Sequence, residues 1–358
     1  MTGILAAIAV LGILIVVHEF GHFIVAKKSG VGILKFSVGF GPTLFGRTVG
    51  GTEYVISAIP LGGFVKMVGE DPDSEEPVDE AISFSHQDLW KRCMIVLAGP
   101  AFNLLFAFLA FSCVYFAYGM PLANPDAEIG HVQEGRPAAA AGFAAGDVIT
   151  SVDGAPIASW VELSEAIRAS DGRELAITAT RDGASVTLRV TPEERDQKNL
   201  FGEVVGAKYY AIGVGPGTIH EDIGLVGSVG TGFERTLWWI STISTSVYKL
   251  VRGEIPAAEI GGPILIAQTA GSQAEQGGLE SLVQFMAVIS INLGILNLLP
   301  IPILDGGHLL FFLIEAVMRR PLDMRQREVA QQVGLVILIA LMAFAFYNDI
   351  GRVLGSWG

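Results

Sequence analysis

Two histidines with a glutamate beside the first stand near the start of the chain, in the segment His18-Glu19-Phe20-Gly21-His22. On a helix, the two histidines are at positions i and i+4 and face the same side. This H-E-x-x-H pattern binds zinc through both imidazoles, and its carboxylate can accept a proton from an activated water. A chance match on a helix is the alternative. The chemistry predicted by these residue types is zinc-dependent hydrolysis of a peptide bond.

The segment lies inside an apolar run, residues 3–26, that meets the ~20-residue requirement for a membrane span. Ionisable side chains are costly in hydrocarbon, so a cluster of them within a span indicates a function. We therefore expect a metal site within the bilayer. A cleaved signal peptide has lysine or arginine before its apolar core, and none precedes this run. We therefore expect the run to be a retained membrane span.

Composition places the whole chain among membrane proteins. Of its 358 residues, 51% are hydrophobic and only 16% are charged, with a mean hydropathy of +0.51. The net charge of −13 argues against nucleic acid as a partner, and the apolar composition makes the lipid bilayer the expected surroundings. Part of the negative charge lies in an acidic, proline-containing stretch, residues 70–80, which we expect to be a solvated loop.

Three further apolar segments complete an expected set of four spans. They are residues 93–118, about 282–304 and about 331–350. Lysine and arginine gather between the first and second spans and between the third and fourth, which predicts that both connections are cytoplasmic. The central region and both termini would then be outside. His18, roughly 22 Å along a helix from Gly3, would lie toward the cytoplasmic side.

The apolar segment 236–251 could be a further span, but it has only 16 residues, six of them serine or threonine. If it crossed, Asp305 would lie on the opposite face from His18. An amphipathic helix on the outer surface is the better interpretation. Residues 216–280 are assigned to this outer segment, between a first unit at 1–120 and the last two spans at 281–358.

Residues 35–67 are rich in glycine and alternate weakly between apolar and polar side chains. This pattern predicts short strands around turns, forming a β-hairpin near the membrane surface. A loop of simple turns is the alternative.

Residues 127–214 change to a soluble α+β pattern, with strands at ITSVDG, LAITATRDG and SVTLRVTP and a short amphipathic helix at VELSEAIRAS. Together with the loop GRPAAAAGFAAGDVI, this stretch resembles a PDZ domain of the bacterial protease type. The resemblance implies one inserted domain, at residues 125–215, that binds an extended peptide or a partner protein by adding a strand to a sheet edge. An unrelated small α+β domain is the alternative.

A third metal ligand is needed because catalytic zinc usually has three protein ligands and an open position. The segment NLLPIPILDGGH, residues 297–308, offers Asp305 after a helix broken by Pro300 and Pro302. Broken backbone is tolerated at membrane depth where it is buried in protein or lines a wet cavity. A turn or helix-capping role is the alternative for Asp305, and His308 is a rival ligand.

Three motifs in order, HEFGH in the first span, AGPAFNLLFA in the second and NLLPIPILDGG in the third, resemble the site-2 protease family of intramembrane zinc metalloproteases. The single PDZ-like domain is similar to the bacterial branch, which cleaves membrane-bound anti-sigma factors. The resemblance implies Zn²⁺ as the cofactor and Glu19 as the catalytic residue. It implies His18, His22 and Asp305 as the zinc ligands. The residues implied to position the substrate are Asn103, Asn292, Asn297, Gly62 and Gly63. The resemblance also implies that residues 35–67 form a β element that pairs with the unwound substrate, with turns at Gly39-Phe40-Gly41 and Gly62-Gly63.

The expected fold is therefore a polytopic α-helical membrane protein with about four transmembrane helices, a membrane-associated β-hairpin region and an inserted PDZ-like α+β domain. The expected function is cleavage, in the bacterial inner membrane, of the transmembrane segments of single-span proteins, such as an anti-sigma factor or remnant signal peptides. A catalytically silent PDZ scaffold and a metal transporter are the competing hypotheses. The intact motif residues disfavour the scaffold, and a transporter would need neither Glu19 nor a PDZ-like domain.

Overall fold

The computed structural model describes residues 2–70, 79–197, 199, 203–320 and 322–355. The chain forms two compact units: Met1–Ala117 together with Leu225–Gly358, and Tyr118–Gly224. Most of the predicted acidic loop, residues 71–78, lies outside the described residues.

Four helices of the first unit are long and apolar enough to cross a membrane, which confirms the expected number of spans for the part of the chain that is described. They are α1 (Thr2–Lys28), α2 (Leu89–Tyr118), α7 (Gly278–Asn297) and α9 (Met324–Val353). The third span was expected to continue to about residue 304, but α7 ends at Asn297. The prolines at 300 and 302 explain this, because proline lacks the N–H that a continuing helix needs. The fourth helix begins earlier than expected, with a polar first turn.

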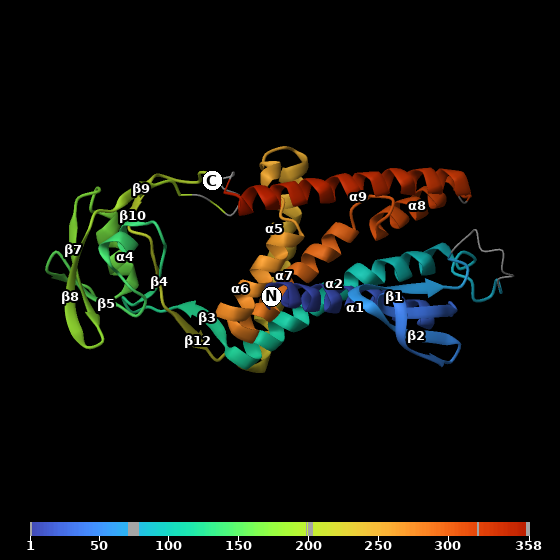
Figure 1. Ribbon diagram of the computed structural model, residues 1–358, viewed down its shortest axis with the longest axis horizontal. Coiled ribbons are helices and arrows are strands. Elements are labelled where there is room, and N and C mark those ends of the chain that lie inside the picture. Colours follow the sequence, from blue (N-terminus) through green and yellow to red (C-terminus); the bar gives the residue numbers. More distant parts are fainter. Residues whose placement is uncertain (1, 71–78, 198, 200–202, 321, 356–358) are drawn as a thin grey trace. The chain divides into compact units, whose positions relative to one another are not determined.

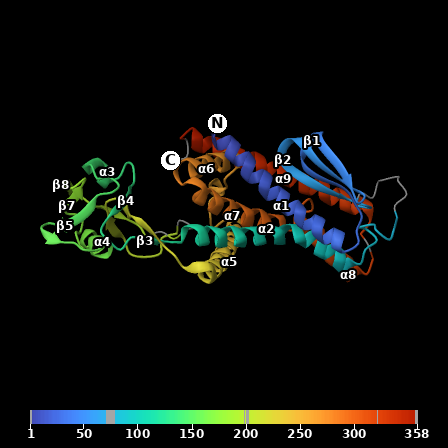
Figure 2. The same cartoon turned by 90° about the horizontal axis from the view of Figure 1, so that it is seen from below.

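The remaining helices of this unit are α5 (Gly224–Val251), the short 3-10 helix η1 (Ala257–Glu259), α6 (Pro263–Gln276) and α8 (Asp305–Met318). In Figures 1 and 2, α5 crosses the direction of α2 and α9 instead of running beside them. It packs closely on α2, since a Cβ on Gly232 would lie 2.8 Å from the backbone nitrogen of Ser112. The segment 236–251 thus belongs to a longer helix that is not among the four candidate spans.

Helix α9 is tied to the start of α6 by one buried carboxylate. Asp349 is 2% exposed and accepts hydrogen bonds from the backbone N–H groups of Gly262, Ile264 and Leu265, at 3.0, 2.9 and 3.1 Å. These are the unpaired donors of a helix amino terminus, where a negative charge is also favourable. The contact fixes α9 at its carboxyl end.

The predicted strands between the first two spans are β1 (Ile33–Val49) and β2 (Thr52–Met67), an antiparallel pair. Gly50 and Gly51 form the connecting turn, with φ of 58° and 83°. Turns were expected at Gly39–Gly41 and Gly62–Gly63. These glycines lie instead inside the strands, and Gly39 and Gly62, with φ of 91° and 125°, mark bends there.

The bends fold each strand back within one sheet (Figure 2). Residues 35–38 pair with residues 63–66 in descending order and with 53–56 in ascending order, while 45–49 pair with 52–56 in descending order. Residues 63–67 therefore form an edge, and among the described residues no further strand pairs with it. The sheet packs on α1 through a buried cluster of Phe23, Ala26, Val31, Ile33, Val65, Met67 and Ile95.

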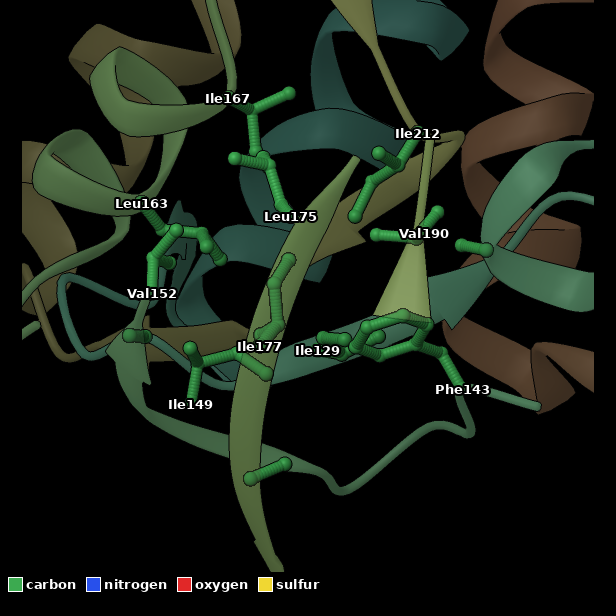
Figure 3. Close-up of a cluster of buried hydrophobic side chains, with 13 residues drawn as sticks. Ile129, Phe143, Ile149, Val152, Leu163, Ile167, Leu175, Ile177, Val190 and Ile212 are labelled. Carbon is green, nitrogen blue, oxygen red and sulfur yellow. The ribbon is translucent and has the colours of Figure 1, made fainter. Parts of the chain in front are cut away.

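The second unit is an α+β domain, which confirms the inserted domain. A four-stranded sheet has the order β6 (Ala155–Pro156), β5 (Val148–Val152), β7 (Leu175–Arg181) and β8 (Ala184–Val190). Three two-stranded pairs accompany it: β3 (Met120–Ala123) with β12 (Thr218–Glu221), β4 (Ile129–Val132) with β11 (Val214–Pro216), and β9 (Glu193–Arg195) with β10 (Tyr209–Ala211). Helices α3 (Pro137–Ala141) and α4 (Trp160–Arg168) complete the unit. Its core (Figure 3) places Leu163 and Ile167 of α4 against Leu175 and Ile177 of β7.

One buried ion pair joins the loop before β5 to β7. Asp147 is fully buried and accepts hydrogen bonds from Nε and Nη2 of Arg181, at 2.6 and 2.7 Å, and from the Ala144 N–H at 2.9 Å. The Arg181 guanidinium holds the pKa of the Asp147 carboxyl below its usual value. The ion pair therefore stabilises the domain whenever the carboxylate is charged.

We expect Asp147→Asn to lower the melting temperature of this domain by about 5–10 °C at neutral pH, because it leaves part of a buried network unpaired. Because the carboxyl pKa is lower in the folded than in the unfolded protein, the ion pair stabilises the fold fully at pH values above the unfolded-state pKa. This stabilisation is lost as the pH falls through the folded-state pKa. The difference between wild type and variant should thus shrink below about pH 4. Glu174→Gln is the matched control, since the Glu174–Arg189 pair is exposed on both sides. An equal effect of both substitutions at neutral pH would contradict the assignment.

Candidate metal centre

Helix α1 places two imidazoles side by side. Their Nε2 atoms, in His18 and His22, are 3.2 Å apart. The carboxylate of Asp305 lies against both, with Oδ2 at 3.1 Å from Nε2 of His18 and Oδ1 at 3.6 Å from Nε2 of His22. One ligand atom from each residue lies within 4.8 Å of the other two, as a metal site requires.

The chain reverses between α7 and α8 to deliver Asp305. After Asn297 the backbone turns through a series of short hydrogen bonds, including Ile301 N–H to Leu299 O at 2.7 Å and Leu304 N–H to Ile301 O at 2.8 Å. Asp305 is then the first residue of α8. Gly306 and Gly307 follow because there is no room for a side chain: a Cβ on either would overlap backbone atoms of this turn.

The donor set fits a divalent metal. Oδ2 of Asp305 is buried and accepts no hydrogen bond of acceptable geometry, although an imidazole nitrogen is close to it. Nδ1 of His22 donates a hydrogen bond to the Ile95 carbonyl at 2.8 Å. The Nε2 atom of His22 then carries a lone pair that faces the cluster. A buried carboxylate oxygen beside two imidazole nitrogens suits a bound cation, and two His nitrogens with one carboxylate oxygen are typical ligands of catalytic zinc.

Glycine at position 99 of α2 makes the room for these rings. A Cβ there would overlap Nε2 of His22 and lie 2.8 Å from Cε1 of His18. Gly21 of α1 meets the neighbouring turn of α2 just as closely, with a Cβ 2.8 Å from the Ala98 carbonyl carbon. The AGP motif therefore lets α1 and α2 approach at the metal centre.

We expect Gly99→Ala to weaken zinc binding by about tenfold or more, because the added methyl group displaces both imidazoles. Gly230→Ala on α5 is the control, since a Cβ there meets no atom within 4 Å. Zinc content and affinity of the two purified variants check this. Equal affinities would show that the rings do not need the space.

Glu19 follows His18 on α1 and lines a cavity of about 560 Å³ together with the cluster. The cavity is lined by residues of α1, α2, α8, the edge segment of β2, the end of α7 and the first turns of α9. The Val65 backbone faces the Glu19 carboxylate, and a Cβ on Gly63 would lie 3.7 Å from Cγ of Glu19. The carboxylate thus stands between the metal ligands and a free sheet edge.

The residues expected to position the substrate lie in different surroundings in the structure. Asn297 lines the cavity, whereas Asn103 and Asn292 do not. Asn103 is fully buried against His18. Gly63 lies beside Glu19, and Gly62 lies beneath the Phe40 ring. The rival ligand His308 lines the cavity but lies outside the ligand cluster found among the described residues.

Sequence reasoning missed a charged cluster at the same cavity. Glu315 of α8 accepts hydrogen bonds from Nη2 and Nη1 of Arg92 at 2.6 and 3.2 Å, and from Nη2 of Arg327 at 3.5 Å. It thereby joins α2, α8 and α9. These arginines were interpreted only as markers of topology; the signal for a further role was a glutamate within the apolar α8 sequence.

Four spans, a metal-ligand cluster within them and a carboxylate beside it define a class: the multi-pass membrane metalloproteases. The sequence model of peptidase family M50 matches residues 6–341. The chain belongs to this family, the site-2 proteases, and is a zinc metalloprotease.

Its relatives cover it almost completely. A Mesorhizobium japonicum protein named as a zinc metalloprotease is 37% identical over 361 residues, which are 95% of this chain and 96% of the relative. The regulator of sigma-E protease RseP of Salmonella typhimurium is 32% identical over 450 residues, which are 97% of this chain and 98% of the relative. The second alignment exceeds the length of this chain, so the Salmonella protein has internal residues without counterpart here. Among solved structures, the PDZ domain of an SdrC-like protein from Listeria monocytogenes matches 26% of this chain and 88% of its own, at 20% identity and a TM-score of 0.20.

Proposed function

We propose that this zinc metalloprotease cleaves peptide bonds inside the transmembrane segments of single-span membrane proteins. His18, His22 and Asp305 hold the zinc, and Glu19 is the general base. The observation that carries the proposal is the position of Glu19 and both histidines on α1, itself a candidate span, where they face a cavity large enough for a short stretch of peptide.

The mechanism follows from what the residues can do. Zinc, when bound, polarises the scissile carbonyl and makes water acidic enough to be deprotonated near neutral pH. Glu19 accepts the proton of the attacking water and passes it to the leaving nitrogen. Asp305 and the two histidines orient the reaction centre against this carboxylate.

A substrate helix must unwind before attack, because its peptide bonds are protected by their own hydrogen bonds. The edge segment 63–67 of β2 offers replacement partners, since its residues Phe64, Val65 and Met67 line the cavity. An unwound substrate can add to this edge as a strand, beside Glu19. Asn297 supplies a side-chain amide to the lining of the same cavity.

The α+β domain supplies a second place for peptide. A cavity of about 250 Å³ lies between α4 and the β10–β11 segment, lined by Leu163, Ile167 and Tyr210 among others. We propose that an extended peptide or partner protein binds here and adds a strand to the domain. The name of the Salmonella relative refers to regulation of sigma-E. For this chain we extend that role to cleavage of an anti-sigma-factor-like, single-span protein in the bacterial inner membrane.

The orientation we propose places the β1–β2 sheet in the cytoplasm and the α+β domain outside. The reason is the basic residues next to the span ends on the sheet side, which are Lys27 and Lys28 at the end of α1 and Lys91 and Arg92 at the start of α2. With Cys93 and Cys113 replaced by alanine, Glu254→Cys should react with an impermeant thiol reagent on the outer face of intact cells. Thr48→Cys should react only after the membrane is opened. Labelling in the reverse order would overturn the orientation.

The proposed function is tested with the purified protein in detergent and two single-span substrates. One has a glycine and proline in its transmembrane segment and the other has alanine and leucine there. We expect the first to be cleaved faster, because it unwinds more easily. A zinc chelator should stop cleavage, and added zinc should restore it. Cleavage that survives chelation, or equal cleavage of a soluble unfolded protein, would refute the proposal.

A further inference from the structure

Three residues of α2 share one face toward the metal cluster. Ile95, Gly99 and Asn103 follow each other at a spacing of four, so they stack along the helix. The first accepts a hydrogen bond from His22, the second leaves room for both rings, and the third contacts His18. Ile95 and Asn103 therefore meet the two imidazoles at Nδ1, on the side away from the cluster, while Gly99 lies between them close to the rings.

An imidazole that binds a metal through Nε2 carries its proton on Nδ1, and that proton needs an acceptor. For His22 the acceptor is the Ile95 carbonyl. For His18 the side-chain amide of Asn103 is in place, 3.1 Å from Nδ1. As oriented, Nδ2 of Asn103 faces the ring, while Oδ1 is buried without a hydrogen-bond partner. A half-turn of the amide brings Oδ1 to Nδ1 in the same space.

The side-chain amide of Asn103 is placed where the His18 imidazole is its hydrogen-bond partner. Asn103 is fully buried and does not line the cavity, so it does not touch substrate. Its backbone carbonyl accepts a hydrogen bond from Ser290 of α7 at 2.8 Å, and Ser290 is also fully buried. Helices α1, α2 and α7 thus meet at Asn103.

We propose that Asn103 is a positioning residue: its side-chain carbonyl accepts the Nδ1 proton of His18 and so turns the Nε2 lone pair of His18 toward the metal. This inference rests on the proposed ligand set. It replaces the direct contact with substrate expected for Asn103.

The test compares zinc dissociation constants of purified full-length variants, measured in detergent by competition with a chelator of known affinity. Asn103→Leu removes the acceptor and should weaken zinc binding by about 10–100-fold. Asn103→Asp keeps an acceptor and should stay within about threefold of wild type. Ser112→Ala is the matched control, because it removes a buried hydroxyl of the same helix that bonds the Phe108 carbonyl and neither imidazole, and its zinc affinity should not change.

The outcomes separate the inference from the function on which it rests. If wild type binds no zinc, the proposed ligand set fails. If wild type binds zinc and Asn103→Leu binds it equally well, the role of Asn103 alone is refuted. Equal weakening by the Leu and Asp variants would also refute it, since a merely structural asparagine is not rescued by aspartate. Asn103→Ala replaces the Leu variant if the latter does not fold, with the same expected loss.

Discussion

Glu19→Gln is expected to lower the rate of substrate cleavage by about 10²–10⁴-fold while leaving bound zinc unchanged. The substitution keeps the shape of the side chain but removes its ability to accept a proton. Glu19 lines the cavity next to both histidines but is not part of the ligand cluster, so the metal should stay. Single-turnover cleavage and elemental analysis of the same preparation measure both effects.

Glu234→Gln is the control for Glu19, because it changes an exposed glutamate of α5 in the same unit. It should cleave like wild type. A Glu19→Gln protein that is fully active would remove the glutamate from the mechanism. Loss of zinc together with activity would instead make Glu19 a ligand.

Asp305→Asn is expected to reduce bound zinc from about one ion per chain to a small fraction of that, with loss of cleavage. The carboxylate supplies the negative charge that faces two imidazoles, and one of its oxygens has no other hydrogen-bond partner. An amide oxygen is a neutral and weaker ligand. Elemental analysis of the purified variant gives the metal content, and its melting curve in a chelator shows whether the apo fold is kept.

His308→Ala distinguishes the two ligand candidates of α8. His308 lines the cavity but lies outside the cluster, so this variant should retain zinc. If His308→Ala lost the metal and Asp305→Asn kept it, His308 would be the third ligand and Asp305 a turn residue.

The parts of the site that come from local spacing could be predicted from the sequence. His18 and His22 share a helix face at any position in a fold, and Pro300 and Pro302 disfavour a helix that continues past Asn297. Apolar length predicted four spans, because it depends on the thickness of the membrane and not on contacts within the protein.

Contacts between helices could not be predicted in this way. The family resemblance implied a substrate contact for Asn103, whereas the packing of α1 on α2 buries this residue against His18. The pairing of residues 35–38 with two different segments of β2 depends on bends at glycines, which the sequence marks as turns without assigning a register. Glu315 meets Arg92 across 223 positions of chain, a separation at which spacing carries no information.

Cleavage inside a transmembrane segment with Glu19 as the base is tested most directly by mapping the cut. The wild-type protein and Glu19→Gln are reconstituted in lipid vesicles with a single-span substrate, and mass spectrometry identifies the new termini. We expect the wild-type protein to cut within the transmembrane segment and the Glu19→Gln variant not to cut. A cut in the soluble part of the substrate, or the same cut with Glu19→Gln, would contradict it.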